Sequence, residues 1–428
     1  MNSYKGDVTM TKRKLISIVL SLCLLVSLAG CGANAKGSNA SNVENKDKPL
    51  VWYNRQPSNP ETGALDYDAV NFNEKTYYVG TDMHQGAKLQ GEMIYEYIEE
   101  NGASLDRNGD GIIGYVLAIG DCGHNYSIAR TRGIRTALKT AVLNGEEVLA
   151  DPVSLNLDGT SGNVKDGDVE ASGKTLKIRE LASKEMVTKD GATWDANAAK
   201  DAIAEWVASF GDQIDLVVSN NDGMAMAMFD GWAYKNHVPA FGYDANGDCV
   251  AAMLDGFCGS VSQRADVQTY LILRVLRNGL DGVDINTGIS IPDDAGNVLD
   301  PSDYYYGDEE RTFYALNEAV TKDNYKEFLD PKKIYEPVSY QLSKDTHPTK
   351  KVFLSIYNGK DDFLSQTFQP LLQQYGYILN LEITFVSGNG HDEASVTREL
   401  TPDDYDAFAI NMVRTDNADE YIYILSDK

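Results

Sequence analysis

The sequence predicts an α/β fold built from parallel sheets that helices cover on both faces. From about Pro49 onward, short apolar runs alternate with longer amphipathic stretches. The runs have the length of buried strands, and the stretches between them have helical periodicity. Strands that alternate with helices in this way are typical of parallel sheets. Hydrophobic residues make up 43% of the 428-residue chain, which is enough for the cores of two or three domains.

The first 30 residues predict an export signal rather than part of the fold. A basic segment at residues 12–14 precedes an apolar run, residues 15–28, that is too short to span a bilayer comfortably. The sequence LAGC, which ends at Cys31, resembles a bacterial lipoprotein signal, in which the cysteine after the cleavage site is diacylated. An ordinary signal with an incidental cysteine is the alternative. Met10 is a candidate for the true start, because the export pattern begins there.

Residues 31–48 are small and polar, and they predict a flexible tether that holds the folded part off the membrane. Two acyl chains on Cys31 would anchor the protein without electrostatic help. The formal net charge is −26, which repels anionic lipid and argues against nucleic-acid binding. We therefore expect an exported protein, lipid-anchored at the outer face of the cytoplasmic membrane, with no nucleic-acid partner.

The strand ends of the predicted sheets are unusually polar. Strands are expected at residues 49–54, 111–120, 215–222, 238–244, 352–357, 379–386 and 406–412, and the clearest helices at residues 85–101 and 194–210. Ligands of parallel α/β sheets bind at the carboxyl ends of strands. Here those ends carry Asn54 and the sequences GDCGH, SNND, GYDAN and YNGKDDF. Polar loops are common at any single strand end, but five together indicate a binding site.

Two segments interrupt the alternation of strands and helices. Residues 155–173 are rich in Gly and Asp and predict a surface excursion, with a hairpin as one option. Residues 330–350 carry three prolines and little periodicity, which predicts an ordered or semi-extended connector.

Five stretches make the sequence similar to the galactose/glucose-binding protein family, which has the periplasmic-binding-protein fold. In chain order they are YYVGTD (77–82), GH…ARTRG (123–133), WDANAAKDAIAEW (194–206), VVSNNDGMAMAM (217–228) and FGYDA (241–245). The resemblance implies two α/β lobes joined by three crossings, each lobe a parallel sheet flanked by helices. It also implies a sugar bound between the lobes.

The resemblance covers nearly the whole mature chain, but in rotated order. The family ends with a segment like KDNYKEFL (322–329), whereas this chain continues, and the residues from Lys350 onward resemble the family's beginning. The residues after the tether match the family about a quarter of the way in. We interpret this order as a circular permutation. A separate C-terminal domain is the alternative, but it would leave the first lobe without most of its sheet.

This interpretation assigns every part of the chain. We expect a signal at residues 1–30, a tether at 31–48 and a permutation linker at 330–349. The first lobe is expected to comprise residues 49–80, 264–289 and 350–428, and the second lobe residues 81–263 and 290–329. The hinge crossings then fall near residues 80–81, 263–264 and 289–291.

The resemblance implies nine sugar-binding residues. A pyranose has apolar C–H faces and a rim of hydroxyls, so its site needs flat aromatics and planar polar groups. Phe363 and Trp194 resemble the two stacking residues, one from each lobe. The implied rim contacts are Asn54 and Asp361 from the first lobe and His124, Arg130, Asn221, Asp244 and Gln263 from the second lobe or its last crossing. The structural alternatives are a core aromatic for Trp194, a loop histidine for His124, a solvated Arg130, and helix caps for Asp361 and Asp244.

Two positions depart from the family pattern. Gln263 stands where the family has an asparagine, which keeps the amide chemistry. Tyr126 stands where the family carries an aspartate, so a charge is lost and bulk is added beside the site. The preferred epimer and anomer are therefore open.

Residues 106–114, DRNGDGIIG, have the spacing that places oxygens around calcium. The expected ligands are the side chains of Asp106, Asn108 and Asp110, the carbonyl of Ile112 and, by resemblance, the more distant Asp215. Gly114 stands where the family has an amide side chain, and Asp215 is shorter than the family's glutamate. We expect a structural Ca²⁺ site, with a metal-free turn as the alternative.

These features favour a solute-binding lipoprotein that captures a D-aldohexose, glucose or galactose, by two-lobe closure. We expect a monomer that does no chemistry and presents its closed form to the permease of an ABC importer. The alternatives are a sensor for a chemoreceptor or histidine kinase, and binding of another monosaccharide such as xylose or ribose. A glycosidase needs two carboxylates flanking one bond, which Asp361 and Asp244 resemble, but the other residues suit hydroxyl binding rather than catalysis.

Overall fold

The structure is a computed structural model that describes residues 44–59, 64–141, 164–329 and 340–426. The chain separates into two units, residues 1–42 and 43–428, and the fold described below lies in the second. The predicted signal, Cys31, most of the tether and the first half of the predicted linker fall outside the described residues. No helix in the described ranges is long and apolar enough to cross a membrane.

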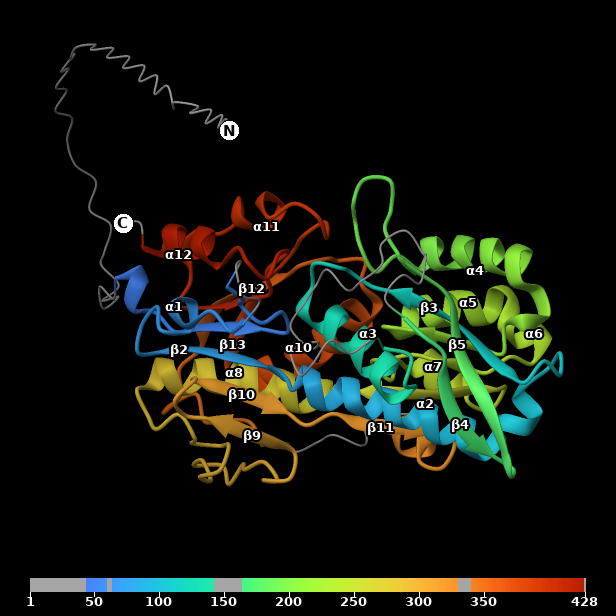
Figure 1. Ribbon diagram of the computed structural model, residues 1–428. Coiled ribbons are helices and arrows are strands. Elements are labelled where there is room, and N and C mark those ends of the chain that lie inside the picture. The colour runs from blue at the N-terminus through green and yellow to red at the C-terminus, as the bar shows by residue number, and fades with distance from the viewer. Residues whose placement is uncertain (1–43, 60–63, 142–163, 330–339, 427–428) are drawn as a thin grey trace, which may run out of the picture. The chain divides into compact units, whose positions relative to one another are not determined.

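The described residues form two sheets of seven strands each (Figure 1). The strands of the first sheet are β1 (Leu50–Tyr53), β2 (Thr76–Thr81), β9 (Tyr304–Gly307), β10 (Thr312–Ala315), β12 (Lys350–Ile356), β13 (Leu381–Ser387) and β14 (Ala407–Ile410). Those of the second sheet are β3 (Ile112–Ile119), β4 (Gly167–Ala171), β5 (Lys174–Glu185), β6 (Leu216–Ser219), β7 (Ala240–Phe241), β8 (Phe257–Ser262) and β11 (Glu318–Thr321).

Most neighbouring strands run parallel. The first sheet has the order β13-β12-β14-β1-β2-β10-β9 and the second the order β11-β8-β7-β6-β3-β5-β4. Antiparallel pairs join β9 to β10, β8 to β11 and β4 to β5. The α/β class with parallel-dominated sheets is therefore confirmed.

The helices pack on the faces of these sheets and begin where polar residues follow strands. They are α1 (Tyr67–Val70), α2 (Met83–Leu105), α3 (Asn125–Ala137), α4 (Ala196–Phe210), α5 (Asp222–Met228), α6 (Tyr234–Asn236), α7 (Gly247–Ala252), α8 (Ala265–Asp281), α10 (Gln369–Ile378), α11 (Ala394–Thr397) and α12 (Ala418–Ser426). Asp82, directly after β2, accepts from the His84 N–H at 2.9 Å and caps α2. Asp195 caps α4 in the same way, accepting from the Ala198 N–H at 2.7 Å. Each cap satisfies an N–H group that the first helical turn leaves without a partner.

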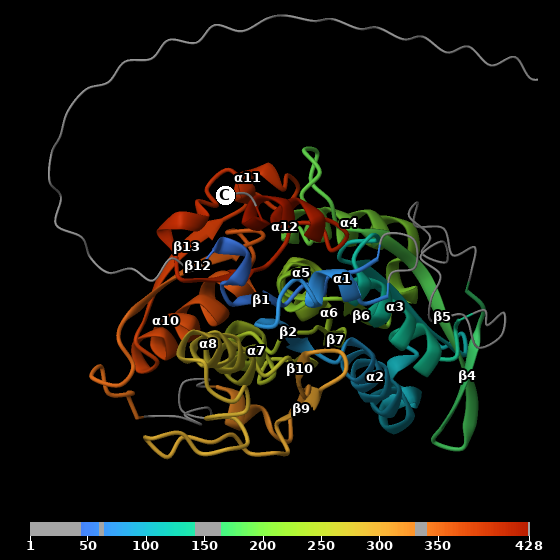
Figure 2. The same ribbon diagram turned by 90° about the vertical axis from the view of Figure 1, so that its left-hand side faces the viewer.

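Three strands of the first sheet come from the end of the chain. β14 pairs in parallel with β1, so that Phe408 lies opposite Leu50, and β12 pairs with β14 on one side and β13 on the other. The Trp52 ring of β1 packs edge-on against Tyr421 of α12, with centroids 6.0 Å apart. Figure 2 shows α12, near the C-terminus, beside α1, near the start of the described fold. The tail therefore shares one core with the N-terminal part of the fold.

Three segments of the described chain connect the two sheets. The first leads from β2 to α2 at Thr81–Asp82, and the second from β8 to α8 at Gln263–Arg264. Both lie where the sequence predicts a crossing. The third leads from β10 to β11 through Leu316–Asn317, and this differs from the predicted crossing at residues 289–291.

The third crossing is displaced because residues 304–315 form a hairpin that belongs to the first sheet. β10 pairs in parallel with β2, with Thr312 opposite Tyr78. The Tyr306 and Phe313 rings stack across the hairpin with centroids 4.3 Å apart. Residues 290–315 therefore do not lie in the second lobe, where the sequence analysis places them.

The predicted surface excursion at residues 155–173 is described only from residue 164. Its last part is the antiparallel hairpin of β4 and β5, which turns at Ser172 and Gly173 with φ of 52° and 76°. The excursion thus ends as an edge hairpin of the second sheet.

Removal of residues 350–428 is expected to prevent folding, because β1 loses its β14 partner and the buried side chains of the first core face water.

A reordered chain tests the same point without deleting the tail. In it, residues 350–426 come first, a short Gly/Ser linker joins them to residue 49, and the chain ends at residue 329. This order keeps every strand pair of the first sheet. We expect its Tm to lie within about 5 °C of the parent's in thermal melts followed by circular dichroism. A truncated chain that melts cooperatively at the parent's Tm would contradict the shared core.

Candidate functional site

All nine residues predicted to contact a sugar line one small cavity of about 40 Å³, called the inner cavity below. They are Asn54, His124, Arg130, Trp194, Asn221, Asp244, Gln263, Asp361 and Phe363. Arg55, Tyr126, Tyr357 and Leu364 complete the lining. The structure thus brings together residues that are up to about 300 positions apart in the sequence.

The backbone is strained at three of the nine positions. Asn54, Trp194 and Asp244 have φ of 58°, 63° and 120°. Positive φ costs a residue with a side chain roughly 1–3 kcal/mol and persists where the surrounding structure holds it. Gly120 helps to hold Trp194, because a Cβ at Gly120 would lie 2.3 Å from the indole atom Cε3. The strain therefore gathers where the chain turns side chains toward the inner cavity.

Arg130, on α3, is the central cation of the inner cavity. Its Nη1 donates to the Asn220 carbonyl at 2.8 Å and stands 3.9 Å from Asp244 Oδ1. The guanidinium lies 3.5 Å above the Tyr243 ring centroid. Gln263 Nε2 donates to Asp244 Oδ1 at 2.6 Å. Burial raises the pKa of Asp244 well above its usual range, and the nearby Arg130 charge opposes that rise.

His124 is buried and held neutral. Burial is the main cause of its lowered pKa, and the positive charges of Arg55 and Arg130 add to it. A neutral imidazole offers one donor and one acceptor, yet neither His124 nitrogen has a hydrogen-bond partner among the described residues. The same is true of Trp194 Nε1 and Arg130 Nε. A buried polar group without a partner costs about 1–3 kcal/mol, so the inner cavity is suited to a ligand rich in hydroxyls.

Asp361 and Asn221 line the inner cavity and also hold helix starts. Tyr357 donates its hydroxyl to Asp361 Oδ2 at 2.7 Å, and the Leu364 N–H donates to Oδ1 at 3.0 Å. Burial raises the pKa of this carboxyl group. Asn221 caps α5 by accepting from the Met224 N–H at 2.9 Å. Asp361 therefore caps a helix start, as the structural alternative predicts, and it also lines the inner cavity. Asp244 instead accepts from the Gln263 side chain.

Phe363 begins a six-residue π-helical turn, Phe363–Phe368, and is 6% exposed. Its ring packs against Phe368 with centroids 5.4 Å apart. Trp194 approaches from the other lobe, where its ring meets His124 edge-on at 5.8 Å. An aromatic side chain of each lobe therefore lines the inner cavity.

Tyr126, which departs from the family pattern, turns its hydroxyl toward the first crossing. It donates to the Thr81 carbonyl at 2.8 Å and lies 2.7 Å from the Tyr78 hydroxyl. Tyr78 in turn donates to the Asn54 carbonyl at 3.1 Å. The tyrosine thus links α3 of the second lobe to the turn that presents Asn54.

Arg55 and Tyr357 line the inner cavity although the sequence did not predict them as site residues. The Arg55 guanidinium lies 3.6 Å above the Tyr357 ring centroid and donates to the Val413 carbonyl. Arg55 follows Asn54 directly, so its place after a strand end was the available signal. Tyr357 is the last apolar residue of a predicted strand, and nothing in that pattern separates it from a core residue.

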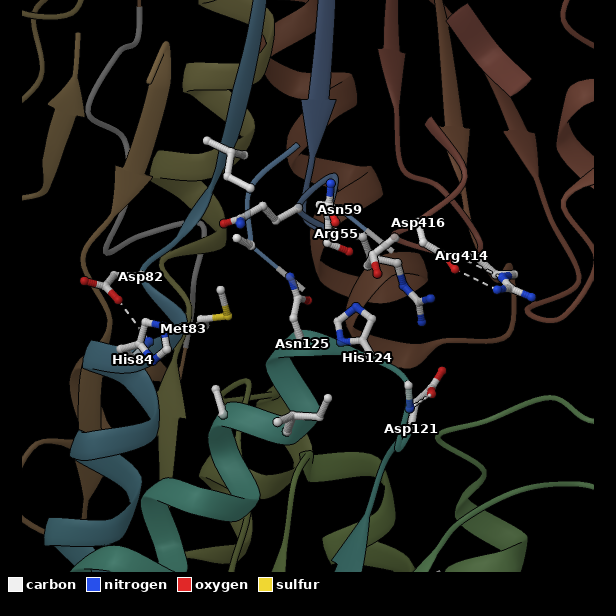
Figure 3. A pocket seen from close by; sticks show the side chains of 18 of the residues that line it. Arg55, Asn59, Asp82, Met83, His84, Asp121, His124, Asn125, Arg414 and Asp416 are labelled. Atoms are coloured by element: carbon white, nitrogen blue, oxygen red, sulfur yellow. Dashed lines mark hydrogen bonds and ion pairs between the residues drawn. The ribbon is translucent and has the colours of Figure 1, made fainter. Parts of the chain in front are cut away.

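Arg55 and His124 also line a second, larger space of about 1060 Å³, called the outer cavity below. In Figure 3 the Arg55 guanidinium points toward the His124 ring near the centre of this cavity. The wall is formed by the starts of α2 and α3, the β9–β10 hairpin and the loops after β1 and β14. The two cavities share these two side chains.

The predicted calcium loop folds as a turn closed by side-chain hydrogen bonds. Asp106 accepts from the N–H groups of Asp110 at 3.0 Å and Gly111 at 2.9 Å. Gly111 has φ of 82°, which the sharp turn needs. Asp110 accepts from the Ile112 N–H at 2.8 Å and the Asn108 amide at 3.1 Å. Asn108 Oδ1 also accepts from the Asp110 N–H at 3.0 Å, so these bonds hold the turn together.

Asp215 contacts the backbone at both ends of this loop. Its oxygens accept from the N–H groups of Arg107 at 3.2 Å and Gly114 at 2.8 Å. Burial raises its pKa to about 7. Within the described ranges no group of three or more His, Cys, Asp or Glu side chains is arranged to hold a metal ion. Calcium binding therefore stays a prediction.

Comparisons with known proteins match both the middle of the chain and its C-terminal tail. Residues 64–283 match a family model described as periplasmic binding protein domain, and residues 349–418 match a second model with the same description. The D-galactose/methyl-galactoside binding periplasmic protein MglB of Haemophilus influenzae is 26% identical over 243 residues, which are 56% of this chain and 59% of that protein. The chain thus spans less than two thirds of that relative's length.

Two further proteins are similar to this chain. A xylitol-binding protein of Mycolicibacterium smegmatis is 27% identical over 287 residues, which are 61% of this chain and 79% of that protein. The crystal structure of an ABC transporter periplasmic solute binding protein of Actinobacillus succinogenes with bound D-allose aligns with a TM-score of 0.41. That alignment has 15% sequence identity and covers 65% of this chain and 71% of the other.

The neutral state of buried His124 predicts a pH dependence of stability. An unfolded imidazole takes up a proton below a pH of about 6.5, whereas the folded protein does not until a much lower pH. The free energy of unfolding of the parent, relative to His124→Gln, should therefore fall by roughly 1 kcal/mol from pH 7.5 to 5.5. Urea unfolding at the two pH values measures it, with His391→Gln at an exposed position as a control. A difference that stays constant would show that folded His124 protonates freely.

Proposed function

Because the chain belongs to the periplasmic binding protein family, we propose that it is an exported solute-binding protein of an ABC importer that captures a D-aldohexose, glucose or galactose, between two lobes. The observation that carries the proposal is the composition of the inner cavity. Aromatic side chains of both lobes, two guanidinium groups, a neutral imidazole, amides and two carboxyl groups surround one small space. The similarity to a galactose-binding relative supports the same class of ligand.

The buried polar groups that have no partner in the described part of the chain support recognition of a sugar. Trp194 and Phe363 cover the apolar faces of the pyranose. His124, Arg130 and the indole N–H meet its hydroxyls, which relieves the cost of leaving those groups unpaired. A hydroxyl both donates and accepts, so the same rim also serves the carboxyl groups of Asp244 and Asp361.

Sugar entry requires the lobes to separate. A water molecule needs about 10–15 Å³, so the inner cavity of about 40 Å³ holds a few waters and is smaller than a hexose. We infer that the lobes open about the three crossings, admit the sugar and close on it. Tyr126 hydrogen-bonds to the first crossing, which supports a role for this residue in closure.

The rotated order supports a circular permutation. The tail supplies β12, β13 and β14 of the first sheet, and the family matches fall on residues 64–283 and separately on 349–418. We propose that residues 330–349 join the original ends of the family fold. We also propose that Cys31 carries a lipid anchor, that the protein is a monomer, and that its closed form meets a permease at the membrane.

A second candidate ligand is a pentitol or a pentose. The xylitol-binding relative favours it, because the alignment covers more of that protein than of the galactose-binding one. Tyr126 adds bulk beside the inner cavity, which suits a smaller ligand. Delivery of occupancy to a chemoreceptor or histidine kinase is an alternative role for the same site.

The proposal predicts a Kd for glucose or galactose in the micromolar range or below, which is about −8 kcal/mol or better. Trp194→Ala should weaken binding by roughly 100-fold, because an aromatic face and a hydrogen-bond donor are lost together. Isothermal titration measures both values, and Trp232→Ala, at an indole of the same lobe outside both cavities, is the matched control.

A panel of glucose, galactose, xylose, ribose, arabinose and xylitol separates the candidate ligands. Tight binding of xylitol or a pentose with no binding of either hexose would replace the hexose proposal. Unchanged hexose binding by Trp194→Ala would refute the assignment of the inner cavity.

For calcium, we expect thermal melting of the protein with 1 mM CaCl₂, roughly 100 times the Kd of a site with sensor-like affinity, to give a higher Tm than melting with EGTA. Asp106→Asn, at the loop position that the calcium pattern restricts to aspartate, should abolish the difference, whereas Asp168→Asn, at an exposed ion pair with Lys177, should leave it. Equal melting temperatures with and without calcium in the parent would favour the metal-free turn.

A further inference from the structure

The outer cavity has the composition of a second sugar subsite. We propose that the ligand is a disaccharide whose first ring occupies the inner cavity and whose second ring occupies the outer cavity. This inference rests on the proposed function, since it assigns the first ring to the inner cavity. It extends that function by adding a second subsite, which none of the nine predicted residues except His124 lines.

The two cavities are connected through two side chains. Arg55 and His124 line both, so a ring in the inner cavity meets the outer cavity between them. His124 is 6% exposed and neither of its nitrogens has a partner in the described part of the chain. A substituent attached to a hydroxyl of the first sugar ring beside Arg55 and His124 therefore extends into the outer cavity. The volume of that cavity, about 1060 Å³, is ample for a second pyranose.

The outer cavity offers an aromatic wall. Tyr305 and Tyr314, on neighbouring strands of the first sheet, stack with centroids 4.8 Å apart and ring planes 25° from parallel. Tyr305 is 40% exposed, and Tyr67, on another part of the wall, is 51% exposed. Flat aromatic faces at an open cavity are the surfaces on which the C–H faces of a sugar stack.

Polar groups face this wall from the second lobe. Asn125 follows His124, and its side-chain oxygen Oδ1 accepts from the Tyr126 N–H at 3.0 Å. Its Nδ2 is buried without a partner among the described residues, and in Figure 3 Asn125 and His124 both point into the cavity from the start of α3. Asn125 therefore supplies a donor that only the outer cavity reaches.

The charges of the outer cavity are nearly balanced, which favours a neutral ligand. Its charged side chains are Asp82, Asp121, Glu310 and Asp416 on one side and Arg55, Arg132 and Arg414 on the other. Asp416 already pairs with Arg414 at 2.8 Å. A phosphorylated or strongly cationic ligand would meet repulsion from one set of charges. A neutral polyhydroxylated ring can hydrogen-bond to both.

Isothermal titration of the full-length protein tests this inference with glucose, galactose, lactose, melibiose, maltose and cellobiose. At least one disaccharide should bind within about tenfold of the Kd of its better hexose. Tyr305→Ala should weaken that disaccharide roughly tenfold and leave hexose binding unchanged, because it removes an aromatic face from the outer cavity alone. Asn125→Ala, which leaves the hairpin intact, should act in the same direction.

Two controls separate binding from folding. Tyr305→Phe keeps the aromatic face and loses only the hydroxyl that donates to Asp82 at 3.4 Å, so it should bind like the parent. Tyr377→Ala removes an exposed tyrosine outside both cavities.

Each outcome has one meaning. Hexose binding without disaccharide binding, or equal weakening of both ligands by Tyr305→Ala and Asn125→Ala, overturns the second subsite and leaves the proposed function intact. Binding of neither class overturns the proposed function and the second subsite with it. Disaccharide binding without hexose binding supports the two subsites and replaces the free hexose as the transported solute.

Discussion

The pairing of β14 with β1 is the interaction on which the rest of the fold depends. It joins residues more than 350 positions apart and fixes the register in which Leu50, Val51 and Trp52 lie opposite residues 408–410. β12 then pairs with β14, so the loop after β12 emerges beside Asn54, at the same edge of the sheet. Asp361 and Phe363 lie in that loop and the turn that follows it. Full burial of one large apolar side chain contributes about 1.5–3 kcal/mol, and the shared core contains many of them.

The inner cavity is costly for a protein without its ligand. It combines strained backbone at Asn54, Trp194 and Asp244 with both ring nitrogens of His124 and Nε of Arg130, which are buried without a partner among the residues that the structure describes. Such costs lower the stability of the closed arrangement until a ligand with matching hydroxyls offsets them. A ligand that interacts better with the closed form than with the open one shifts the population toward closure. On the proposed function, these same features would make closure depend on ligand binding.

Much of this arrangement could be predicted from sequence because strand ends and polar tips are local signals. Asn54, Asn221 and Asp244 follow apolar runs directly, and parallel pairing brings such tips to one edge. The hairpin at residues 304–315 could not be predicted in this way. Its short strands follow each other without an intervening helix, and its tyrosines stack only once the strands pair. The direction of the Tyr126 hydroxyl could not be predicted from the sequence either, because it depends on a contact with Tyr78 in the other lobe.

The central claim is that the tail and the middle of the chain form one site around one sugar. A crystal structure of the protein grown with the tightest-binding hexose tests it most directly. The account predicts a pyranose in the inner cavity that contacts Asp361 or Phe363 from the tail and Trp194 or Arg130 from the second lobe. A sugar bound elsewhere, or held by one lobe without any contact to the tail, would contradict it.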